Sequence, residues 1–275
     1  MKKLVLGILT LFIMYACTRV PITNRKQLIL ISDNEMNAMA FTSYKQFLDT
    51  NKVVPYNNNQ ALMVKRVGDK ISKAAEYYFQ AINHPEYLQG YQWQTELVQS
   101  NQVNAWCMPG GKMVVYTVIL PITQTEQGLA VVMGHEVSHA IAKHGAERMS
   151  QGLVAQGLLV GGQVALGVTM RDKPRETQAL WGAALGVASV GAQVGMLAFG
   201  RQHESEADHL GLIFMSIAGY NPQEAIPFWQ RMAAKAGGAK PPEFLSTHPS
   251  DETRIKQIGE WMPEALQYYN KTNTK

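Results

Sequence analysis

The stretch that decides the fold is residues 125–150, TEQGLAVVMGHEVSHAIAKHGAERMS, with His-Glu-Val-Ser-His at positions 135–139. Apolar side chains recur in it at helical spacing, and neither proline nor a run of β-branched residues interrupts it: Leu129, Val132, Met133 and Ile141. The pattern therefore predicts one helix over residues 125–150.

On a helix, residues four apart lie on the same face, so the imidazoles of His135 and His139 can reach a single ion. Glu136 stands beside the first histidine, close enough to a metal-bound water to take its proton. This spacing predicts a zinc site with His135 and His139 as ligands and Glu136 as general base. Because HExxH arises by chance in roughly one chain of this length in a hundred, the prediction needs a further motif.

A catalytic zinc needs a third protein ligand and an open position for water. Downstream, residues 201–209 read RQHESEADH, in which Glu204 and Asp208 are again four apart. One carboxylate can serve as a ligand, and the other can orient a ligand histidine by accepting its second N–H. On spacing alone, His203 and His209 compete for the ligand role.

The N-terminus has the layout of a bacterial secretory signal. Lys2 and Lys3 precede an apolar run, LVLGILTLFIMYA, which ends at Ala16 and is followed by Cys17. We expect residues 1–16 to be a signal peptide and Cys17 to carry acyl chains, palmitate among them, at the start of a lipidated tether over residues 17–31. The alternative is ordinary signal cleavage with Cys17 incidental. Cys107, the other cysteine, would then be a lone structural thiol.

The composition is that of a globular protein, with 46% hydrophobic and 17% charged residues. Removal of the signal leaves 23 basic against 21 acidic side chains, a balance that gives no reason to expect nucleic acid as a partner. We expect a single catalytic domain over residues 32–270. Its fold class should be mainly α with a small β-sheet.

Several further elements follow from periodicity and from turn residues. A capping box of Ser32 and Glu35 predicts a helix to about Asp49. A second helix is expected over residues 60–79, and strands over 91–98 and 112–119. After a helix that follows Glu206, breaks are expected at 219–222 and 237–242, and a last helix over 250–269.

Residues 151–170 and 178–200 carry no charged side chain and flank the polar insert RDKPRE. Each is close to the length of a membrane span, so a pair of membrane helices is one interpretation. Frequent glycine and interspersed glutamine favour the other, a helical hairpin 151–200 that is soluble or lies at a membrane surface. His144, five residues after His139, should face away from the zinc and make a surface or interhelical contact.

Four motifs in order resemble the M48-type zinc metallopeptidases. HEVSH is followed by E-x-x-A-D at Glu204–Asp208, and NAWCMPGG at 104–111 is similar to the segment that leads to the family's cleft edge strand. STHP at 246–249, followed by Arg254, is similar to its C-terminal element. This gluzincin family includes the CAAX prenyl endopeptidases and periplasmic lipoprotein proteases of bacteria, and the likeness covers residues 25–254.

The resemblance implies a zincin-like metallopeptidase domain with an active-site helix, a cleft edge strand and one Zn²⁺ per chain. It implies Glu204 as the third ligand and Asp208 as the outer carboxylate that orients a ligand, with Glu206, His203 and His209 as bystanders. Asn104 and Ala105 would bind substrate. His248 would lie at the mouth of the site, where it stabilises an oxyanion or transiently caps the metal.

The function expected from this likeness is that of a zinc endopeptidase of the bacterial cell envelope, lipid-anchored, facing the periplasm and on the outer rather than the inner membrane. Misfolded or unassembled envelope polypeptides would bind as an added strand along 112–119. One rival is a zinc-binding lipoprotein that acts as a chaperone or assembly factor, but such a protein would not need the general base Glu136. The other rival is an integral membrane peptidase built on residues 151–200.

Overall fold

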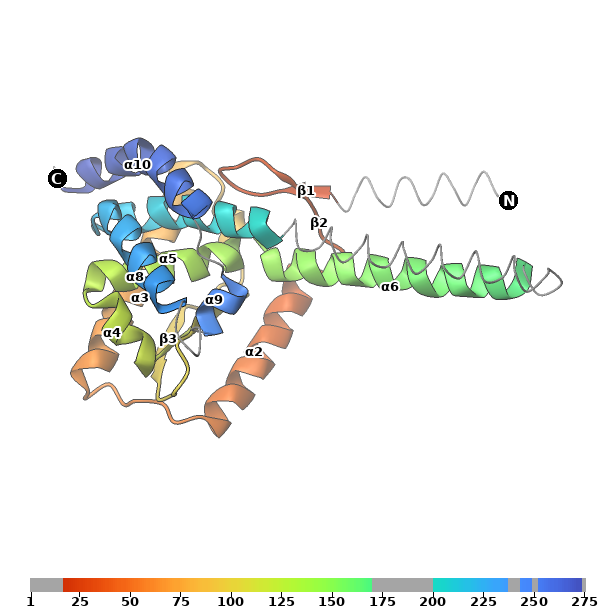
Figure 1. Cartoon of the computed structure of the whole chain (residues 1–275), viewed down its shortest axis with the longest axis horizontal. Coiled ribbons are helices and arrows are strands. Elements are labelled where there is room, and N and C mark those ends of the chain that lie inside the picture. Colours follow the sequence, from red (N-terminus) through yellow and green to blue (C-terminus); the bar gives the residue numbers. More distant parts are fainter. Residues whose placement is uncertain (1–16, 170–199, 237–242, 249–251, 274–275) are drawn as a thin grey trace. The chain divides into compact units, whose positions relative to one another are not determined.

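The computed structural model describes residues 17–169, 200–236, 243–248 and 252–273 (Figure 1). The chain divides into two compact units, residues 32–143 with 204–275 and residues 1–31 with 144–203. Helices predominate and the sheets are small, which confirms the predicted α+β class.

The larger unit begins with two long helices, α2 (Asp33–Thr50) and α3 (Asn59–Ala81). The predicted capping box is present, since the Ser32 hydroxyl accepts from the Glu35 N–H and the Glu35 carboxylate accepts from the Ser32 N–H. The apolar stripe of α3 is buried as its spacing predicts, and it faces α5 and β3: Val64, Val67, Ile71, Ala74 and Tyr78. A short 3-10 turn, η1 (Pro85–Leu88), follows.

The three-stranded sheet has the order β3-β5-β4, with β3 (Gln94–Val98) parallel and β4 (Ala105–Met108) antiparallel to β5 (Lys112–Tyr116). The strand predicted over 112–119 thus ends at Tyr116 and gives way to η2 (Thr117–Ile119). Because β5 is paired on both sides, the prediction that a substrate pairs with it is wrong. The antiparallel edge strand of this sheet is β4.

Helix α5 (Glu126–Ile141) is the centre of the larger unit, and all of its residues from Gly128 onward are buried. It follows the short α4 (Leu120–Thr123), is capped by the Thr125 hydroxyl, and packs against α3 and β4. The helix predicted over 125–150 is not continuous, because the chain breaks at Ala142 and Lys143. Lys143 has a φ of 57°, in the left-handed region that an α-helix does not use.

A second buried helix, residues 200–217, packs closely against α5. A Cβ on Gly134 would lie 2.9 Å from the Gly211 carbonyl oxygen, and one on Gly211 would lie 2.9 Å from the His135 nitrogen. Two glycines therefore let the helix that carries Glu204 approach the helix that carries the HExxH motif.

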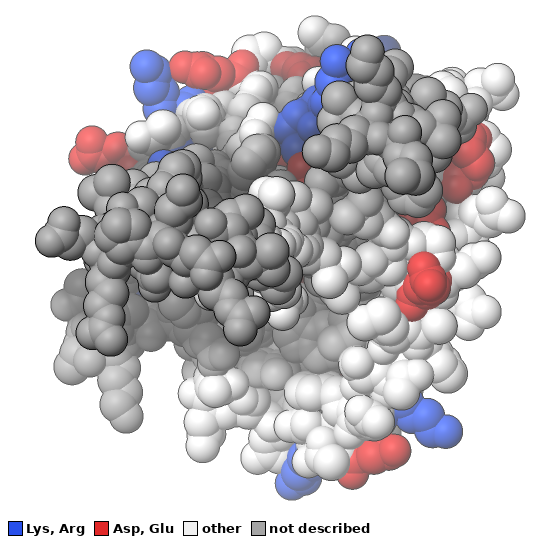
Figure 2. All heavy atoms as spheres, turned by 90° about the vertical axis from the view of Figure 1, so that its right-hand side faces the viewer, with Lys and Arg blue, Asp and Glu red and all other residues white. Residues whose placement is uncertain are grey.

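The remaining elements of this unit are η3 (Pro222–Glu224), α8 (Ala225–Ala236), α9 (Glu243–Thr247) and α10 (Glu252–Asn273). Gly219, with a φ of 84°, marks the predicted break before η3. The break predicted at 237–242 and the start predicted for the last helix at Ser250 lie outside the described residues. On the face drawn in Figure 2, described acidic and basic side chains lie near one another at the top and bottom of the view, and the right-hand side shows acidic side chains alone.

In the smaller unit, β1 (Cys17–Arg19) and β2 (Lys26–Leu28) form an antiparallel hairpin where an extended tether was expected. Val20 and Gln27 are buried, and the Leu30 N–H donates to the Ser150 hydroxyl of α6 (His144–Thr169) at 2.9 Å. Within the part of the chain that is described, no helix has the length and apolarity needed to cross a membrane. The predicted signal peptide and residues 170–199 of the predicted hairpin fall outside it.

Candidate metal centre

The two histidines of the HExxH motif lie on adjacent turns of α5 and converge. Their Nε2 atoms are 3.0 Å apart, and both side chains are buried. Burial, together with the neighbouring His135 and His248, lowers the pKa of His139 to about 3 despite the opposing effect of Glu204. His139 is therefore neutral at physiological pH, as a metal ligand must be.

Glu204 reaches the same point from the helix of residues 200–217. Its Oε2 lies 3.2 Å from the Nε2 of His135, and its Oε1 lies 3.3 Å from the Nε2 of His139. Burial opposes ionisation of this carboxyl, but hydrogen bonds from the three surrounding histidines outweigh it and hold the pKa of Glu204 well below its usual range. The side chain is a carboxylate aimed at the two imidazoles.

His248 directly follows the short helix α9, and its backbone N–H donates to the Phe244 carbonyl at 2.8 Å. Its Nδ1 is 3.1 Å from the Nε2 of His135 and 2.8 Å from the Oε2 of Glu204. This is the position of a fourth ligand that closes the open site, one of the two roles expected for His248. In the other role, as oxyanion donor, the imidazole would have to turn away from the ligand set.

The four donor atoms lie within 4.8 Å of one another. In a tetrahedral zinc site with Zn–N distances of 2.0–2.1 Å, neighbouring ligand atoms are about 3.3 Å apart. The spacings between His135, His139 and Glu204 match this value closely. Three nitrogens and one carboxylate are a donor set that zinc accepts, so the residues fit the predicted ion.

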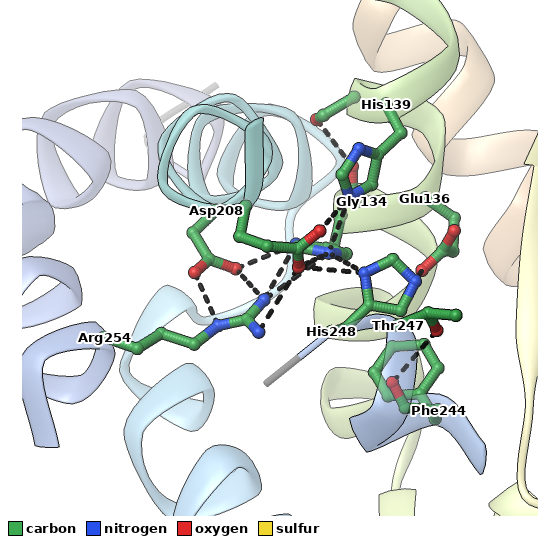
Figure 3. Close-up of polar contacts among 11 residues, drawn as sticks. Gly134, Glu136, His139, Asp208, Phe244, Thr247, His248 and Arg254 are labelled. Carbon is green, nitrogen blue, oxygen red and sulfur yellow. Dashed lines mark hydrogen bonds and ion pairs between the residues drawn. The ribbon is translucent and has the colours of Figure 1, made fainter. Parts of the chain in front are cut away.

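Glu136, between the two histidines in sequence, points beside the donor set rather than into it (Figure 3). It is buried, and its Oε1 lies 3.4 Å from the Nε2 of His248. A carboxylate next to the ligands, on the side of His248, is placed to take a proton from a water at the open position.

Asp208 holds the first histidine in place. Its Oδ1 accepts from the Nδ1–H of His135 at 2.8 Å, which leaves the Nε2 lone pair for the metal. Burial raises the pKa of Asp208, but the charges of Arg254 and His135 lower it by more. The net shift of the pKa is therefore downward. The structure thus places Asp208 where the predicted orienting carboxylate should be.

Arg254 completes this arrangement, and reasoning from the sequence assigned it no role. Its Nη2 donates to Asp208 Oδ1 at 2.7 Å, and its Nε lies 2.7 Å from Asp208 Oδ2. Such a two-point contact fixes the carboxylate in both position and rotation. The signal in the sequence was the arginine of the C-terminal element that follows STHP.

The two histidines that competed with Glu204 are engaged elsewhere. His203 lies 3.0 Å from Glu147, and His209 lies 2.7 Å from Glu264 and stacks on Trp261. His144 is buried and stacks on His203, which is the interhelical contact predicted for it.

Asn104 and Ala105 lie at the start of the edge strand β4. The backbone N–H of Tyr116 donates to the Asn104 carbonyl. Because the hydrogen-bonding groups of successive residues in an antiparallel strand point to alternate sides, the backbone groups of Ala105 and Cys107 point to the other edge of β4, away from β5. The Ala105 N–H is held by the Asn104 side chain at 2.9 Å. The predicted substrate-binding pair therefore stands where the outward edge of β4 begins.

Two histidines and a buried glutamate on an HExxH helix, together with a ligand carboxylate from a second helix, define the class of zinc metallopeptidases. Residues 58–262 match the model of peptidase family M48, and the chain belongs to that family. It is a metalloendopeptidase whose cofactor is zinc.

Relatives of known activity are both mitochondrial and bacterial. The chain is 32% identical to mitochondrial metalloendopeptidase OMA1 of Schizosaccharomyces pombe, over 90% of this chain and 66% of that protein. It is 30% identical to the protein of the same name from Saccharomyces cerevisiae, over 98% of this chain and 76% of that protein. It is 33% identical to the β-barrel assembly-enhancing protease of Yersinia pestis, over 58% of this chain and 32% of that one.

Proposed function

We propose that this chain is a zinc endopeptidase of the bacterial cell envelope that degrades misfolded or unassembled envelope proteins. The observation that carries the endopeptidase mechanism is the buried set of His135, His139 and Glu204 with Glu136 beside it. The envelope role is supported by the lipoprotein-like start of the sequence and by the likeness to β-barrel assembly-enhancing proteases.

The residues of the site have distinct tasks. When bound, a zinc ion polarises the scissile carbonyl and lowers the pKa of a water in the open position. Glu136 takes the proton of the attacking water and passes it to the leaving amine. His248 either donates to the developing oxyanion or, in the position described above, closes the site until substrate displaces it.

Substrate recognition is assigned to the outward edge of β4. An extended polypeptide that pairs there uses the Ala105 carbonyl and the backbone groups of Cys107, since the Ala105 N–H already donates to Asn104, and so needs no particular side chains. Val103, just before the strand, already accepts from the Phe244 N–H of α9 at 3.0 Å. The added strand would therefore begin beyond Val103. A folded protein offers few extended segments of this kind, whereas an unassembled one offers many.

The decisive assay compares one outer-membrane β-barrel protein in two states, unfolded in urea-diluted buffer and folded in detergent. We expect the purified chain to cleave the unfolded form, and chelation of zinc or Glu136→Gln to slow this cleavage strongly. Equal cleavage of both forms would contradict the proposal that the enzyme recognises its substrates by accessible, extended backbone. Protection of the unfolded form from aggregation without cleavage would favour the chaperone alternative.

The proposed anchor is tested separately in cells. We expect Cys17→Ala to move the protein from the membrane to the soluble fraction, with Cys107→Ala as the matched control that stays with the membrane. Retention of the Cys17→Ala protein in the membrane after carbonate extraction would instead support the integral membrane alternative.

A further inference from the structure

Trp229 of α8 is fully buried and lies directly under Arg254. The Cζ atom of the guanidinium is 3.3 Å from the centroid of the indole ring, a stacking distance. Since Arg254 is itself buried, this cation–π contact is desolvated, and such contacts are stronger than exposed ones. Arginine suits this position because its planar group can stack on a ring and still present its N–H groups sideways.

The edge of the guanidinium faces Asp208: Nη2 donates a hydrogen bond to Oδ1, and Nε forms an ion pair with Oδ2, each at 2.7 Å. Asp208 in turn orients His135. The indole therefore lies at the base of a chain of contacts that ends at a metal ligand. Its ring also meets the His135 ring almost edge-on, with the centroids 5.8 Å apart at 70°.

A second branch leads from Trp229 to His248. The Phe244 ring stacks on the indole with a centroid distance of 5.9 Å, and the His248 ring lies 4.6 Å from that of Phe244. Because α9 is only five residues long and ends just before His248, its own hydrogen bonds fix the imidazole weakly, and packing on Phe244 supports it beside its polar contacts with His135 and Glu204. Both branches start from the same buried side chain.

We propose that Trp229 is a positioning residue of the metal centre, which sets His135 through Arg254 and Asp208 and sets His248 through Phe244. Trp229 supplies none of the four donor atoms. The inference rests on the proposed zinc site but not on the proposed substrates, so zinc affinity is its primary measurement.

The test compares Trp229→Leu and Trp229→Phe with Phe79→Leu, a matched variant of another fully buried aromatic residue whose ring contacts are to Tyr78, Tyr87 and Phe214. Zinc dissociation constants come from competition with a chromophoric chelator and are corrected for the folded fraction by circular dichroism. We expect Trp229→Leu to weaken zinc binding 10–100-fold, the usual effect of losing support around a ligand. Trp229→Phe, which keeps a flat ring, should recover part of the affinity.

Phe79→Leu should lower the melting temperature and leave the zinc affinity unchanged. If Trp229→Leu binds zinc like the wild type, or if Phe79→Leu weakens binding as much, Trp229 is an ordinary core residue and the proposal fails. Should Trp229→Leu not fold, Trp229→Phe and Arg254→Lys still decide the matter. Arg254→Lys keeps the charge but loses the planar fork, so it should also weaken zinc binding.

A double-mutant cycle supplies the last check. If Trp229 acts through Arg254, Trp229→Phe should weaken zinc binding less in the Arg254→Lys background than in the wild type. Strictly additive losses would show that the two residues act independently and would overturn the first branch of the proposal.

Discussion

The described part of the chain contains two largely buried clusters of histidine and glutamate with different roles. In the zinc cluster (His135, His139, Glu204 and His248), the ring nitrogens and the carboxylate converge on one point. In the Arg25 cluster (Arg25, His144, Glu147 and His203), two imidazole rings stack with centroids 4.2 Å apart and planes at 13°. Stacked rings direct their nitrogens outward in parallel planes, not toward a shared centre.

The carboxylates differ as much as the rings do. Both oxygens of Glu147 are held by Arg25, at 2.8 and 2.7 Å, and one also lies 3.0 Å from His203. In the zinc cluster the arginine is Arg254, and its Nε lies 2.7 Å from Asp208 Oδ2. Its Nη1 lies 3.5 Å from Glu204 Oε2, so its contact with the ligand carboxylate is the longer one. The two clusters thus differ in which carboxylate the arginine holds: in the zinc cluster its closer contacts are to Asp208, and the oxygens of Glu204 lie nearer to the imidazoles than to Arg254.

The largest expected effect comes from Glu136. We expect Glu136→Gln to lower peptide cleavage by about 10²–10⁴-fold, because the general base is lost, and to keep bound zinc, because no ligand changes. Glu147→Gln in the Arg25 cluster is the matched control and should keep both zinc and activity per folded molecule. Metal analysis and peptide cleavage on the same preparations measure this, and wild-type turnover by Glu136→Gln would contradict the mechanism.

Next in size is the effect of Glu204. Glu204→Gln should reduce zinc occupancy, since a neutral amide oxygen is a weaker ligand than a carboxylate. Glu206→Gln, two residues further along the same helix, should retain its metal. Atomic absorption after gel filtration reports both values. Loss of zinc from the Glu206 variant alone would mean that the wrong carboxylate has been assigned to the metal.

For His248, which comes from a short helix rather than from α5 or residues 200–217, we expect a smaller change. His248→Ala should keep zinc on the three other ligands and slow cleavage of a short peptide about 10²–10³-fold, the usual cost of losing an oxyanion donor. Faster cleavage would show instead that His248 mainly caps the metal. Unchanged kinetics on peptide and protein substrates alike would remove it from the mechanism.

Breaking the Arg25 cluster should affect stability and not metal binding. We expect Arg25→Met to lower the free energy of unfolding by about 3–5 kcal/mol, because it leaves the Glu147 carboxylate buried without its cation. Arg19→Met, on the exposed part of the same hairpin, is the control and should change stability by less than about 0.5 kcal/mol. Urea titration of the zinc-loaded proteins gives the values. Loss of zinc from Arg25→Met would contradict the conclusion that the Arg25 cluster contributes to stability and not to metal binding.

The smallest effect is a pH dependence that belongs to Glu147. Burial raises its pKa, but the contacts with His203 and Arg25 lower it more, so the folded protein holds this carboxyl ionised to lower pH than the unfolded chain does. The stabilisation is complete above the ordinary value of 4.5 and is lost as pH falls through the lower folded pKa. We expect Glu147→Gln to have a flatter stability profile than the wild type below pH 4.5. Parallel profiles would show that other carboxyls dominate acid unfolding.

Local patterns could be read from the sequence with some accuracy. The capping box at Ser32, the buried stripe of α3 and the shared face of His135 and His139 all appear as expected. The break after Ile141 was missed, because Ala142 and Lys143 are ordinary helix formers and only the left-handed backbone of Lys143 ends the helix. The hairpin of residues 17–31 was missed because its strands are only three residues long.

What the sequence determined by itself was the chemistry: which residues can bind zinc, which can act as base, and that two of the ligands share a helix. Because an α-helix repeats every 3.6 residues, the shared face of His135 and His139 follows from their spacing in the sequence alone. Only the tertiary structure decided that β5 is the central strand and β4 an edge strand, and that Glu204, His248 and the Arg254–Asp208 pair meet at His135. Strand order and the close packing of α5 on residues 200–217 at Gly134 and Gly211 depend on contacts between distant segments, which no local period encodes.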